Sequence, residues 1–495
     1  MAVTVIVMIL MAGNSQGNQL VRLKMTTNSA DYSAKQIWEM DKKHFIHPYN
    51  DFSTFSDEGS QVISKAGGMY VTDAEGRSYL DAIAGLWCVN IGHGRKEMAD
   101  TISEQVLNME YYNPFGHCTN EPGSILAAKL AELAPGDLNH VFYTCGGSTA
   151  VDSAIRLVHF YNNQRGKPNK KQIISRNNAY HGSTYVAANL TGIHATKHSF
   201  DRIANNWINH VSAADLFHRP KGAEHLSEEA YTEFLVNEFE NRILQLGEDN
   251  VAAFIAEPIM GAGGVLVAPT GYHKAMQAIC QKYDILYIAD EVVTSFGRLG
   301  YIFASEAVFD MQPDIIITAK GISSGYIPLG AAIISSRIYE VIAKPQCEGG
   351  LLSMGYTYTG HPVACAAALK NIEIIERENL LEHVRNIGPY FQEKIQGLRG
   401  LKIFGDARGS HLMLGLEFVA DNNTKSPLPA EAKVANRVFQ HCRDLGVIIR
   451  PIGNTIVMSP PLVISKAQID TLAETLRVAI ENTTADLVKD GFIDN

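Results

Sequence analysis

Cysteine is sparse in this sequence, and its positions follow no regular spacing. The chain has seven cysteines and no CxxC pair: Cys88, Cys118, Cys145, Cys280, Cys347, Cys365 and Cys442. An odd, scattered set of this kind fits neither a disulfide framework nor a zinc site. We therefore expect a cytoplasmic protein in a reducing environment, and no bound metal ion.

Basic clusters and long apolar runs are also missing. The formal net charge is -10 at pH 7, whereas a nucleic-acid surface needs clustered Lys and Arg to neutralise phosphates. The apolar stretch of residues 1–11 lacks a basic flank and is too short to span a bilayer. A second methionine, Met25, precedes a polar segment, which favours residues 1–25 as a dispensable extension over a cryptic export signal. Neither nucleic acid nor a membrane is expected as a partner.

The remaining composition is that of an ordinary globular protein. Apolar residues make up 46% and charged residues 19% of the 495 residues, and there are 41 glycines. This length favours two closely associated domains, and no linker rich in Pro, Gly or Ser divides them. We expect residues 26–85 and 351–495 to contribute a smaller domain, and residues 86–350 to form a large one.

The first half of the chain alternates between helical and strand patterns. Residues 30–45 read as a helix, and residues 68–80 as a hairpin. A helix over residues 121–133, a strand over 141–144 and a helix over 151–161 follow. Such alternation is typical of a mostly parallel sheet covered by helices.

The C-terminal part has a different pattern. Residues 409–419 alternate like one antiparallel strand, and residues 455–459 form another. Residues 430–445 and 465–481 have helical periodicity. These elements predict a smaller α+β unit, joined by the N-terminal hairpin.

Three short apolar runs in the middle of the chain read as strands buried on both faces. They cover residues 251–256, 285–289 and 314–319. Each is followed by one ionisable residue, in order Glu257, Asp290 and Lys320. Because sites in parallel α/β sheets lie beyond the carboxyl ends of the strands, these three residues are expected to meet in one crevice.

Lys320 and Asp290 have matching chemistry. Desolvation lowers the pKa of a lysine at the end of a buried strand, and the neutral amine is a nucleophile toward an aldehyde. An aspartate nearby can bond the protonated pyridine nitrogen of pyridoxal phosphate. Alone, Lys320 would be read as a strand-end lysine and Asp290 as a turn or cap residue, but the pair favours a cofactor site.

Two weaker signals agree with this interpretation. Residues 145–149 (CGGST) lie between a strand and a helix, where backbone N–H groups can bind an anion. Tyr180 follows a predicted strand over residues 172–175 and could stack on a cofactor ring. Tight turns and core aromatics are common, so both signals depend on Lys320 and Asp290.

From about residue 44 to about residue 487, the chain resembles the class III (omega) pyridoxal-phosphate-dependent aminotransferases, in particular the amine or omega-amino acid:pyruvate subgroup. The matching segments are GLWCVN at 85–90, YHGS at 180–183, AFIAEP at 253–258, DEV at 290–292, FGR at 296–298, AKG at 319–321, GYTYTGHP at 355–362 and MSPPL at 458–462. The resemblance implies an α/β protein of PLP-dependent transferase fold type I. Such a fold has a large cofactor-binding domain, with a mostly parallel seven-stranded sheet flanked by helices, and a smaller α+β domain from both chain ends.

The resemblance also implies roles for individual residues. Lys320 would be the Schiff-base lysine and Asp290 the partner of the pyridine nitrogen. The other cofactor-binding residues would be Tyr180 and Val292 on the two ring faces, Gly147 and Ser148 at the phosphate, His181, Glu257, and Thr357 from a second subunit. A homodimer with shared active sites follows, and a tetramer stays open.

On the substrate side, the resemblance implies a pocket lined by Leu86, Trp87, Tyr180, Phe115 of a second subunit, and Arg450, which would pair with the carboxylate of a keto acid. The implied reaction is a ping-pong transfer of an amino group from a primary amine to pyruvate, giving alanine and an aldehyde or ketone. The donor stays open among taurine, β-alanine, 4-aminobutyrate, polyamines and arylalkyl amines. An aminomutase or decarboxylase of the same fold, and a catalytically silent regulator, are the alternatives.

Three segments depart from the family pattern. Gly146 and Thr149 replace a Ser and a Glu in the phosphate turn, Met260 stands where Gln is common, and residues 294–295 are Thr-Ser instead of Cys-Gly. These changes could weaken the contacts to phosphate and ring, whereas Lys320 and Asp290 are unchanged.

Overall fold

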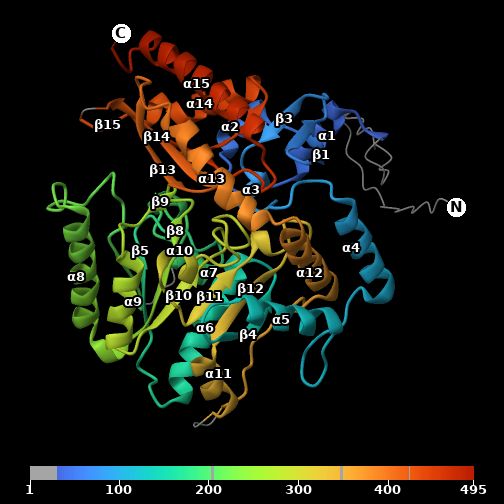
Figure 1. Cartoon of the computed structure of the whole chain (residues 1–495), viewed down its shortest axis with the longest axis vertical. Coiled ribbons are helices and arrows are strands. Elements are labelled where there is room, and N and C mark those ends of the chain that lie inside the picture. Colours follow the sequence, from blue (N-terminus) through green and yellow to red (C-terminus); the bar gives the residue numbers. More distant parts are fainter. Residues whose placement is uncertain (1–30, 202–205, 346–348, 423, 495) are drawn as a thin grey trace, which may run out of the picture. The chain divides into compact units, whose positions relative to one another are not determined.

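The computed structural model describes residues 31–201, 206–345, 349–422 and 424–494 (Figure 1). The expected extension, residues 1–25, lies outside this part of the chain, as does Cys347. The described residues form two compact units, one made of residues 31–63 and 73–75 and the other of the remaining described residues.

The first unit, where it is described, contains the helices α1 (Ala34–His44) and α2 (Phe52–Glu58). α1 confirms the helix predicted over residues 30–45. It begins at a capping box, in which Ser33 Oγ accepts a hydrogen bond from the Gln36 N–H and the Gln36 side chain accepts one from the Ser33 N–H. Both backbone donors are thereby satisfied, which explains why the helix starts there.

The second unit is built on a seven-stranded sheet. In spatial order its strands are β4 (Leu138–Thr144), β12 (Gly330–Ser335), β11 (Ile315–Thr318), β10 (Leu286–Asp290), β7 (Val251–Ala256), β5 (Gln172–Arg176) and β6 (Ile208–Val211). Neighbouring strands are parallel except that β12 runs antiparallel to β11 and β4. This confirms the expected mostly parallel seven-stranded sheet.

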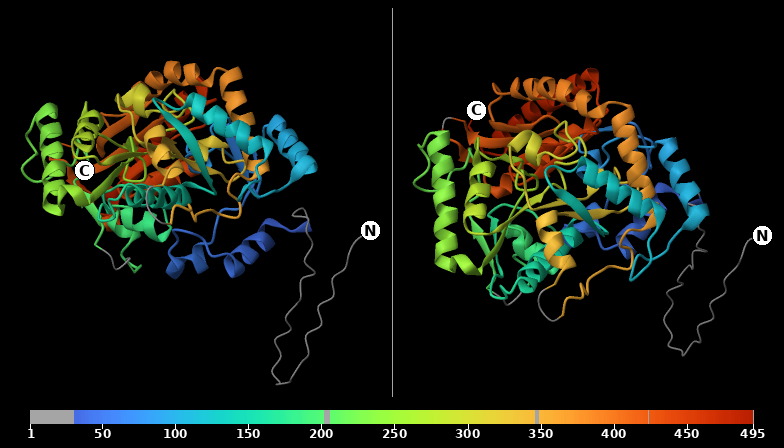
Figure 2. Two further views of the ribbon diagram at one scale, coloured as in Figure 1. Left: turned by 90° about the horizontal axis from the view of Figure 1, so that it is seen from below. Right: turned by 60° about the horizontal axis from the view of Figure 1, so that its bottom comes forward.

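Helices cover both faces of this sheet (Figure 2). Successive strand residues point to opposite faces: Ile255 packs on the side of α6, α7 and α11, and Phe254 on the side of α5, α8, α9 and α12. These helices are α5 (Glu121–Leu133), α6 (Gly147–Gln164), α7 (Tyr185–Leu190), α8 (Glu228–Leu246), α9 (Tyr272–Lys282), α11 (Ser336–Ala343) and α12 (Pro362–Arg377). Because both faces are buried, the strands are continuous apolar runs.

Two smaller sheets complete the second unit. One has the order β1-β2-β3-β16 and the other is five-stranded, with the order β13-β14-β18-β17 and β15 beside β14. Their strands are β1 (Ile63–Gly67), β2 (Tyr70–Asp73), β3 (Ser78–Asp81), β13 (Phe404–Ser410), β14 (Met413–Asp421), β15 (Ser426–Pro427), β16 (Val447–Ile448), β17 (Arg450–Ile452) and β18 (Thr455–Met458). β2 and β3 form the predicted hairpin, and β16 pairs in parallel with β3. The N-terminal hairpin therefore joins the C-terminal part, as predicted.

The remaining elements connect or cover these sheets. They are α3 (Ala84–Trp87), α4 (Lys96–Met109), β8 (Ile259–Met260), β9 (Leu266–Val267), α10 (Ser305–Phe309), α13 (Leu380–Gln396), α14 (Val434–Asp444) and α15 (Lys466–Lys489). In the described part of the chain, no helix combines the length and the apolar character that crossing a membrane requires. The domain boundaries at residues 85 and 350 stay a prediction.

The prediction of one strand over residues 409–419 is wrong. The segment contains the end of β13, a tight turn and most of β14, which pairs antiparallel with β13. His411 makes the turn with φ +49°. Asn or Gly in the sequence usually indicates a hairpin turn. A histidine seldom adopts the left-handed conformation, so His411 does not predict a turn.

Other boundaries shift by a few residues. α5 matches the prediction, but α6 begins at Gly147 and not at residue 151. The predicted helix over residues 430–445 is interrupted by Lys433 at φ +45°, so that only α14 is a regular helix. α15 runs on to Lys489 because it stays amphipathic beyond the predicted end at residue 481.

Candidate active site

The carboxyl edge of the seven-stranded sheet gathers the ionisable residues predicted from the sequence. β7, β10 and β11 are adjacent and parallel, and Glu257, Asp290 and Lys320 stand at their carboxyl ends. β12 runs in the opposite direction, so that its first residue, Gly330, pairs with Thr144 at the end of β4. The glycine turn after β4 therefore reaches the same edge, as a site of this fold class requires.

Lys320 begins the short 3₁₀ turn η4 (Lys320–Ile322) after β11. Its backbone has φ +47°, a left-handed conformation that costs an L-residue about 1–2 kcal/mol. Its Nζ lies 5.8 Å from the centroid of the Trp87 ring. Removal from water lowers the pKa of the Lys320 amine, and the negative charge of Asp290 opposes this shift. Burial thus shifts the Lys320 amine toward its neutral form.

Asp290 is the last residue of β10 and is 4% exposed. Its Oδ2 lies 2.8 Å from His181 Nδ1, and its Oδ1 accepts a hydrogen bond from the Val292 N–H at 3.2 Å. Among the described residues, the buried His181 Nε2 has no hydrogen-bond partner. Asp290 is therefore oriented from two sides at the edge of the sheet.

Glu257 holds the loop that carries Tyr180. Its Oε1 accepts a hydrogen bond from the Tyr180 N–H, and its Oε2 accepts one from the Gly261 N–H, both at 2.9 Å. Burial raises the pKa of the Glu257 carboxyl, an effect that His181 partly opposes. Because it accepts hydrogen bonds from two backbone N–H groups, Glu257 connects the loop of Tyr180 to the segment of Gly261.

The phosphate turn predicted at residues 145–149 leads directly into α6. A Cβ atom on Gly147 would lie 3.2 Å from both Cγ atoms of Val292, so the turn passes close to the residue that follows the Asp290 strand. Ser148 Oγ accepts a hydrogen bond from the Ser183 N–H at 3.0 Å. Within the described chain, no side chain caps the start of α6. Its first N–H groups are thus suited to bind an anion.

Trp87 and Arg450 lie next to Lys320. Trp87 is 5% exposed, and its Nε1 has no hydrogen-bond partner among the described residues. The guanidinium carbon of Arg450, at the start of β17, lies 5.0 Å from the centroid of the Trp87 ring. Leu86 precedes Trp87 and is 44% exposed. The two predicted substrate residues Trp87 and Arg450 are therefore brought together with the lysine.

Phe115 and Thr357 are exposed on loops that contact each other. A Cβ atom on Gly355 would lie 2.5 Å from the Phe115 ring, and Tyr111 OH donates a hydrogen bond to Thr357 O. In the chain as described, Thr357 makes no hydrogen bond to Lys320 or Asp290. The loop that carries Thr357 reaches the start of α6 through Tyr356 OH, which donates a hydrogen bond to Thr149 O at 3.2 Å.

Sequence reasoning gave no role to Glu291, which is fully buried. It accepts hydrogen bonds from the Ala304 N–H at 2.7 Å, the Ser305 N–H at 2.9 Å and the Thr294 hydroxyl at 3.0 Å. Burial raises the pKa of the Glu291 carboxyl. The sequence feature that could have indicated this role is the position of Glu291, an acidic residue directly after Asp290 in an otherwise apolar segment.

Two departures from the family pattern have clear structural positions. Thr149 Oγ1 donates a hydrogen bond to Gly146 O at 2.9 Å, which closes the phosphate turn. Met260 is 1% exposed and packs in a small apolar cluster. Thr149 thus has a local hydrogen-bond partner in the phosphate turn, and Met260 has an apolar environment.

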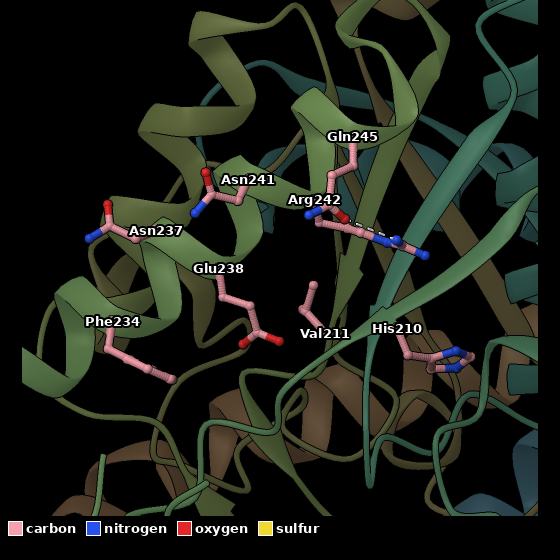
Figure 3. A pocket seen from close by; sticks show the side chains of 8 residues that line it. All are labelled: His210, Val211, Phe234, Asn237, Glu238, Asn241, Arg242 and Gln245. Carbon is pink, nitrogen blue, oxygen red and sulfur yellow. Dashed lines mark hydrogen bonds between the residues drawn. The ribbon is translucent and has the colours of Figure 1, made fainter. Parts of the chain in front are cut away.

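A wide groove of about 630 Å³ lies elsewhere, between β6 and α8 (Figure 3). Polar residues of α8 line it, among them Glu238 and Arg242, with His210 and Val211 of β6. It contains none of the predicted site residues. We therefore place the chemistry at the carboxyl edge of the sheet and not in this groove.

The residues at that edge fit pyridoxal phosphate. The cofactor offers an aldehyde for the Lys320 amine, a basic ring nitrogen for Asp290 and a phosphate for the uncapped end of α6. The buried and unpartnered polar atoms His181 Nε2 and Trp87 Nε1 also indicate that a polar group belongs there. In the described residues, no cluster of three or more His, Cys, Asp or Glu side chains could hold a metal ion.

Comparison with known proteins agrees with this fit. Residues 54–480 match the family model of the class-III aminotransferases. The chain is 39% identical to a putrescine–pyruvate aminotransferase of Pseudomonas aeruginosa, over 92% of this chain and 99% of that protein. It is 40% identical to the mitochondrial gamma-aminobutyrate transaminase 1 of Oryza sativa subsp. indica, over 95% of each chain.

A solved structure gives the same result for the fold. The thermostable (S)-enantioselective omega-transaminase from Thermomicrobium roseum superposes with a TM-score of 0.87 at 39% identity, covering 91% of this chain and 99% of that one. The chain therefore belongs to the class-III aminotransferase family and is a pyridoxal-phosphate-dependent aminotransferase.

Proposed function

We propose that this enzyme moves an amino group from an omega-amino acid, a diamine or another primary amine to pyruvate, giving an aldehyde or ketone and alanine. The observation that carries the proposal is the pair of Lys320 and Asp290 at the ends of adjacent parallel strands, with Arg450 and Trp87 beside the lysine. The relatives named for putrescine, pyruvate and gamma-aminobutyrate support this substrate range.

The cofactor would be held by residues from several loops. Lys320 would bind it covalently through Nζ, and the N–H groups of Gly147 and Ser148 would bind its phosphate. Tyr180 and Val292 would lie against the two ring faces. Asp290, oriented by His181, would keep a proton on the ring nitrogen, and Glu257 would hold the Tyr180 loop in place. When bound, pyridoxal phosphate supplies an aldehyde carbon that exchanges amines and a protonated ring that stabilises negative charge.

Lys320 would then serve as the acid and base of the reaction. Once its Nζ is released by the incoming amine, the neutral amine can take the proton from the donor carbon and deliver it on the cofactor side. The lowered pKa of Lys320 supports this role, because a lysine that is charged at neutral pH cannot accept a proton. In the second half-reaction, Lys320 Nζ would move the proton in the opposite direction. The mechanism would be ping-pong because the first product leaves before pyruvate binds.

Arg450 would bind the carboxylate of pyruvate. A guanidinium grips a carboxylate through two parallel hydrogen bonds, and the Trp87 ring beside it can hold its face when no carboxylate is present. Leu86, Tyr180 and Phe115 would complete the pocket on the side of the amine donor.

The active enzyme would be a cytoplasmic homodimer. Phe115 and Thr357 are exposed, together with Leu351 and Tyr358 at 80% and 59%. Apolar side chains this exposed on neighbouring loops favour burial against a second subunit. Thr357 of one chain would then reach the phosphate held by the other, and Phe115 its substrate.

The test is to load purified protein with pyridoxal phosphate, remove the excess and follow the visible absorbance while amines are added. We expect one class of amine to bleach the band and pyruvate to restore it, with alanine as the product. Lys320→Ala should form no such band and show no repeated turnover. A band that no amine bleaches, or bleaching that pyruvate cannot reverse, would contradict transfer to pyruvate.

A further inference from the structure

The turn that carries Lys320 is only weakly stabilised by its own backbone hydrogen bonds. Lys320 and Ser324 have φ +47° and +50°. The hydrogen bonds within the turn are long: Ser323 N to Lys320 O and Ser324 N to Gly321 O both measure 3.3 Å. Side chains seldom tolerate the left-handed region unless their surroundings impose it. Groups outside the turn must therefore keep it in place.

Asn371 of α12 supplies such a group. Its Nδ2 donates hydrogen bonds to Gly321 O at 2.8 Å and to Ile322 O at 3.0 Å. Its Oδ1 accepts one from Ser324 Oγ at 2.6 Å. All three bonds go to the turn after Lys320, and they are shorter than the two backbone bonds of 3.3 Å within the turn. Asn371 is 0% exposed, so water does not compete with them.

Asn371 is a polar residue in apolar surroundings, so packing alone does not explain why it is there. It stands on the apolar face of α12, next to Ile372 and one turn after Ala367 and Ala368, all of them buried. A buried amide costs free energy unless its donors and acceptor are satisfied. On the other side of the turn, a Cβ atom on Gly321 would lie 2.6 Å from Asn90 Nδ2. The turn is thus enclosed by two asparagines.

We propose that Asn371 is a positioning residue that fixes the η4 turn and thereby aims Lys320 Nζ. The inference rests on the proposed function, in which Lys320 is the reacting amine. Asn371 acts through the carbonyl groups of Gly321 and Ile322. Without it, the turn relaxes toward ordinary backbone angles and Nζ spends less time in the reactive direction. Reactions of Nζ slow down, while the amine and pyruvate still bind.

The experiment compares Asn371→Leu with a matched control, Asn162→Leu. Asn162 is also fully buried; its Nδ2 donates to Val158 O at 3.0 Å, and its Oδ1 accepts from Arg165 at 2.9 Å, within α6 and its end. Both variants lose buried hydrogen bonds and should lower the melting temperature. Three quantities are measured besides stability: the rate at which apoenzyme captures pyridoxal phosphate, the pH titration of the resulting visible band, and kcat and KM for the amine.

For Asn371→Leu we expect the capture rate and kcat to fall about 10-fold or more, because small misplacements of a reacting group have large effects on rate, with KM changed less than about 3-fold. The midpoint of the pH titration should also move. Asn162→Leu should leave all of these within about 2-fold of wild type. Equal values for the two variants would overturn the role of Asn371.

Two further results keep the inference testable. If Asn371→Leu does not fold, Ser324→Ala is the second variant; it removes the bond to Asn371 Oδ1 at 2.6 Å and a longer bond from the Ile91 N–H at 3.3 Å. It should still lower the capture rate and kcat by about 2- to 5-fold, and no change would count against the inference. If the wild-type protein forms no band that depends on Lys320, the proposed function itself fails. A normal wild-type band with no difference between the variants instead defeats the positioning role alone.

Discussion

At the scale of single residues, the site combines a strained lysine with an oriented carboxylate. Lys320 is held at φ +47°, and Asp290 is bonded by both His181 and the Val292 N–H. Strain at a functional residue persists only where the surroundings enforce it. The proposed chemistry would therefore depend also on residues that hold Lys320 and Asp290 in place.

Asp290→Asn tests the electrostatic role of the carboxylate. An amide is neutral and cannot stabilise a proton on the ring nitrogen, so kcat should fall by about 10² to 10³ while KM for the amine changes little. The half-reaction with a single amine, followed by the loss of visible absorbance, measures this directly. As a control, the exposed Asp310, which pairs with Lys274, should tolerate Asp310→Asn within about 2-fold. Equal effects at both positions would contradict the assignment.

The lowered pKa of Lys320 predicts how cofactor capture depends on pH. Only the neutral amine attacks an aldehyde, so the capture rate rises with pH until Lys320 is deprotonated. Because burial lowers the pKa of Lys320 below the ordinary value of 10.5, the rate should level off below pH 10.5. A soluble lysine derivative measured beside the apoenzyme provides the reference. A protein curve that coincides with the reference would contradict a desolvated lysine.

At the scale of elements, buried or half-buried carboxylates hold loops to the sheets. Glu291 ties the segment after β10 to the start of α10 through the Ala304 and Ser305 N–H groups. Glu417 of β14 bonds both His218 and Arg408, the latter at 2.6 Å. The contact of His218 with Glu417 joins segments 199 residues apart in the sequence.

Glu291→Gln should destabilise the protein more than its small change in shape suggests. Both carboxylate oxygens of Glu291 accept hydrogen bonds from N–H or O–H groups. A glutamine at this position would therefore turn its NH₂ group, which is itself a donor, toward at least one of these donors. We expect a loss of about 2–4 kcal/mol in the free energy of unfolding, measured by urea denaturation with an unchanged slope. Glu306→Gln, on the exposed side of α10, is the control. A loss below about 0.5 kcal/mol for Glu291→Gln would show that the loop is held by other contacts.

The pair of His218 and Glu417 predicts a pH-dependent contribution to stability. The Glu417 side chain raises the pKa of His218, and His218 and Arg408 keep the pKa of Glu417 low despite its burial. A raised histidine pKa stabilises the fold below the ordinary value of 6.5, and this is lost as the pH rises through the raised pKa. His218→Gln should therefore lower the melting temperature by about 1–2 °C at pH 6 and not at pH 9. An equal decrease at both pH values would indicate a packing effect.

At the scale of the whole molecule, a second chain would complete the proposed site. Phe115 and Thr357 lie on exposed loops, while the other predicted site residues meet at the edge of the seven-stranded sheet. A symmetric dimer supplies the same loops twice. Shared active sites would explain why these loops expose apolar side chains.

Complementation tests whether sites are shared. Lys320→Ala and Thr357→Asp should each be inactive alone, the second because its charge repels the phosphate. When the two are co-expressed, a mixed dimer contains one intact site made from Lys320 of one chain and Thr357 of the other, so random mixing should restore about one quarter of wild-type activity. If Thr357 acts within its own chain, no activity returns. The mixed dimers are then isolated by two different tags and should have about one half of wild-type activity per dimer, because one of their two sites is intact.

Much of this protein was determined by its local sequence. The buried apolar runs predicted β7, β10 and β11, and the residues that end them predicted the site, because strand periodicity and residue chemistry are local properties. The prediction over residues 409–419 failed since the turn at His411 carries no local signal. Tertiary structure alone decided the contacts of His181 with Asp290, of Glu291 with Ser305 and of Asn371 with Gly321. Partners distant in sequence meet only when the sheet and helices pack, and no pattern of neighbouring residues encodes such contacts.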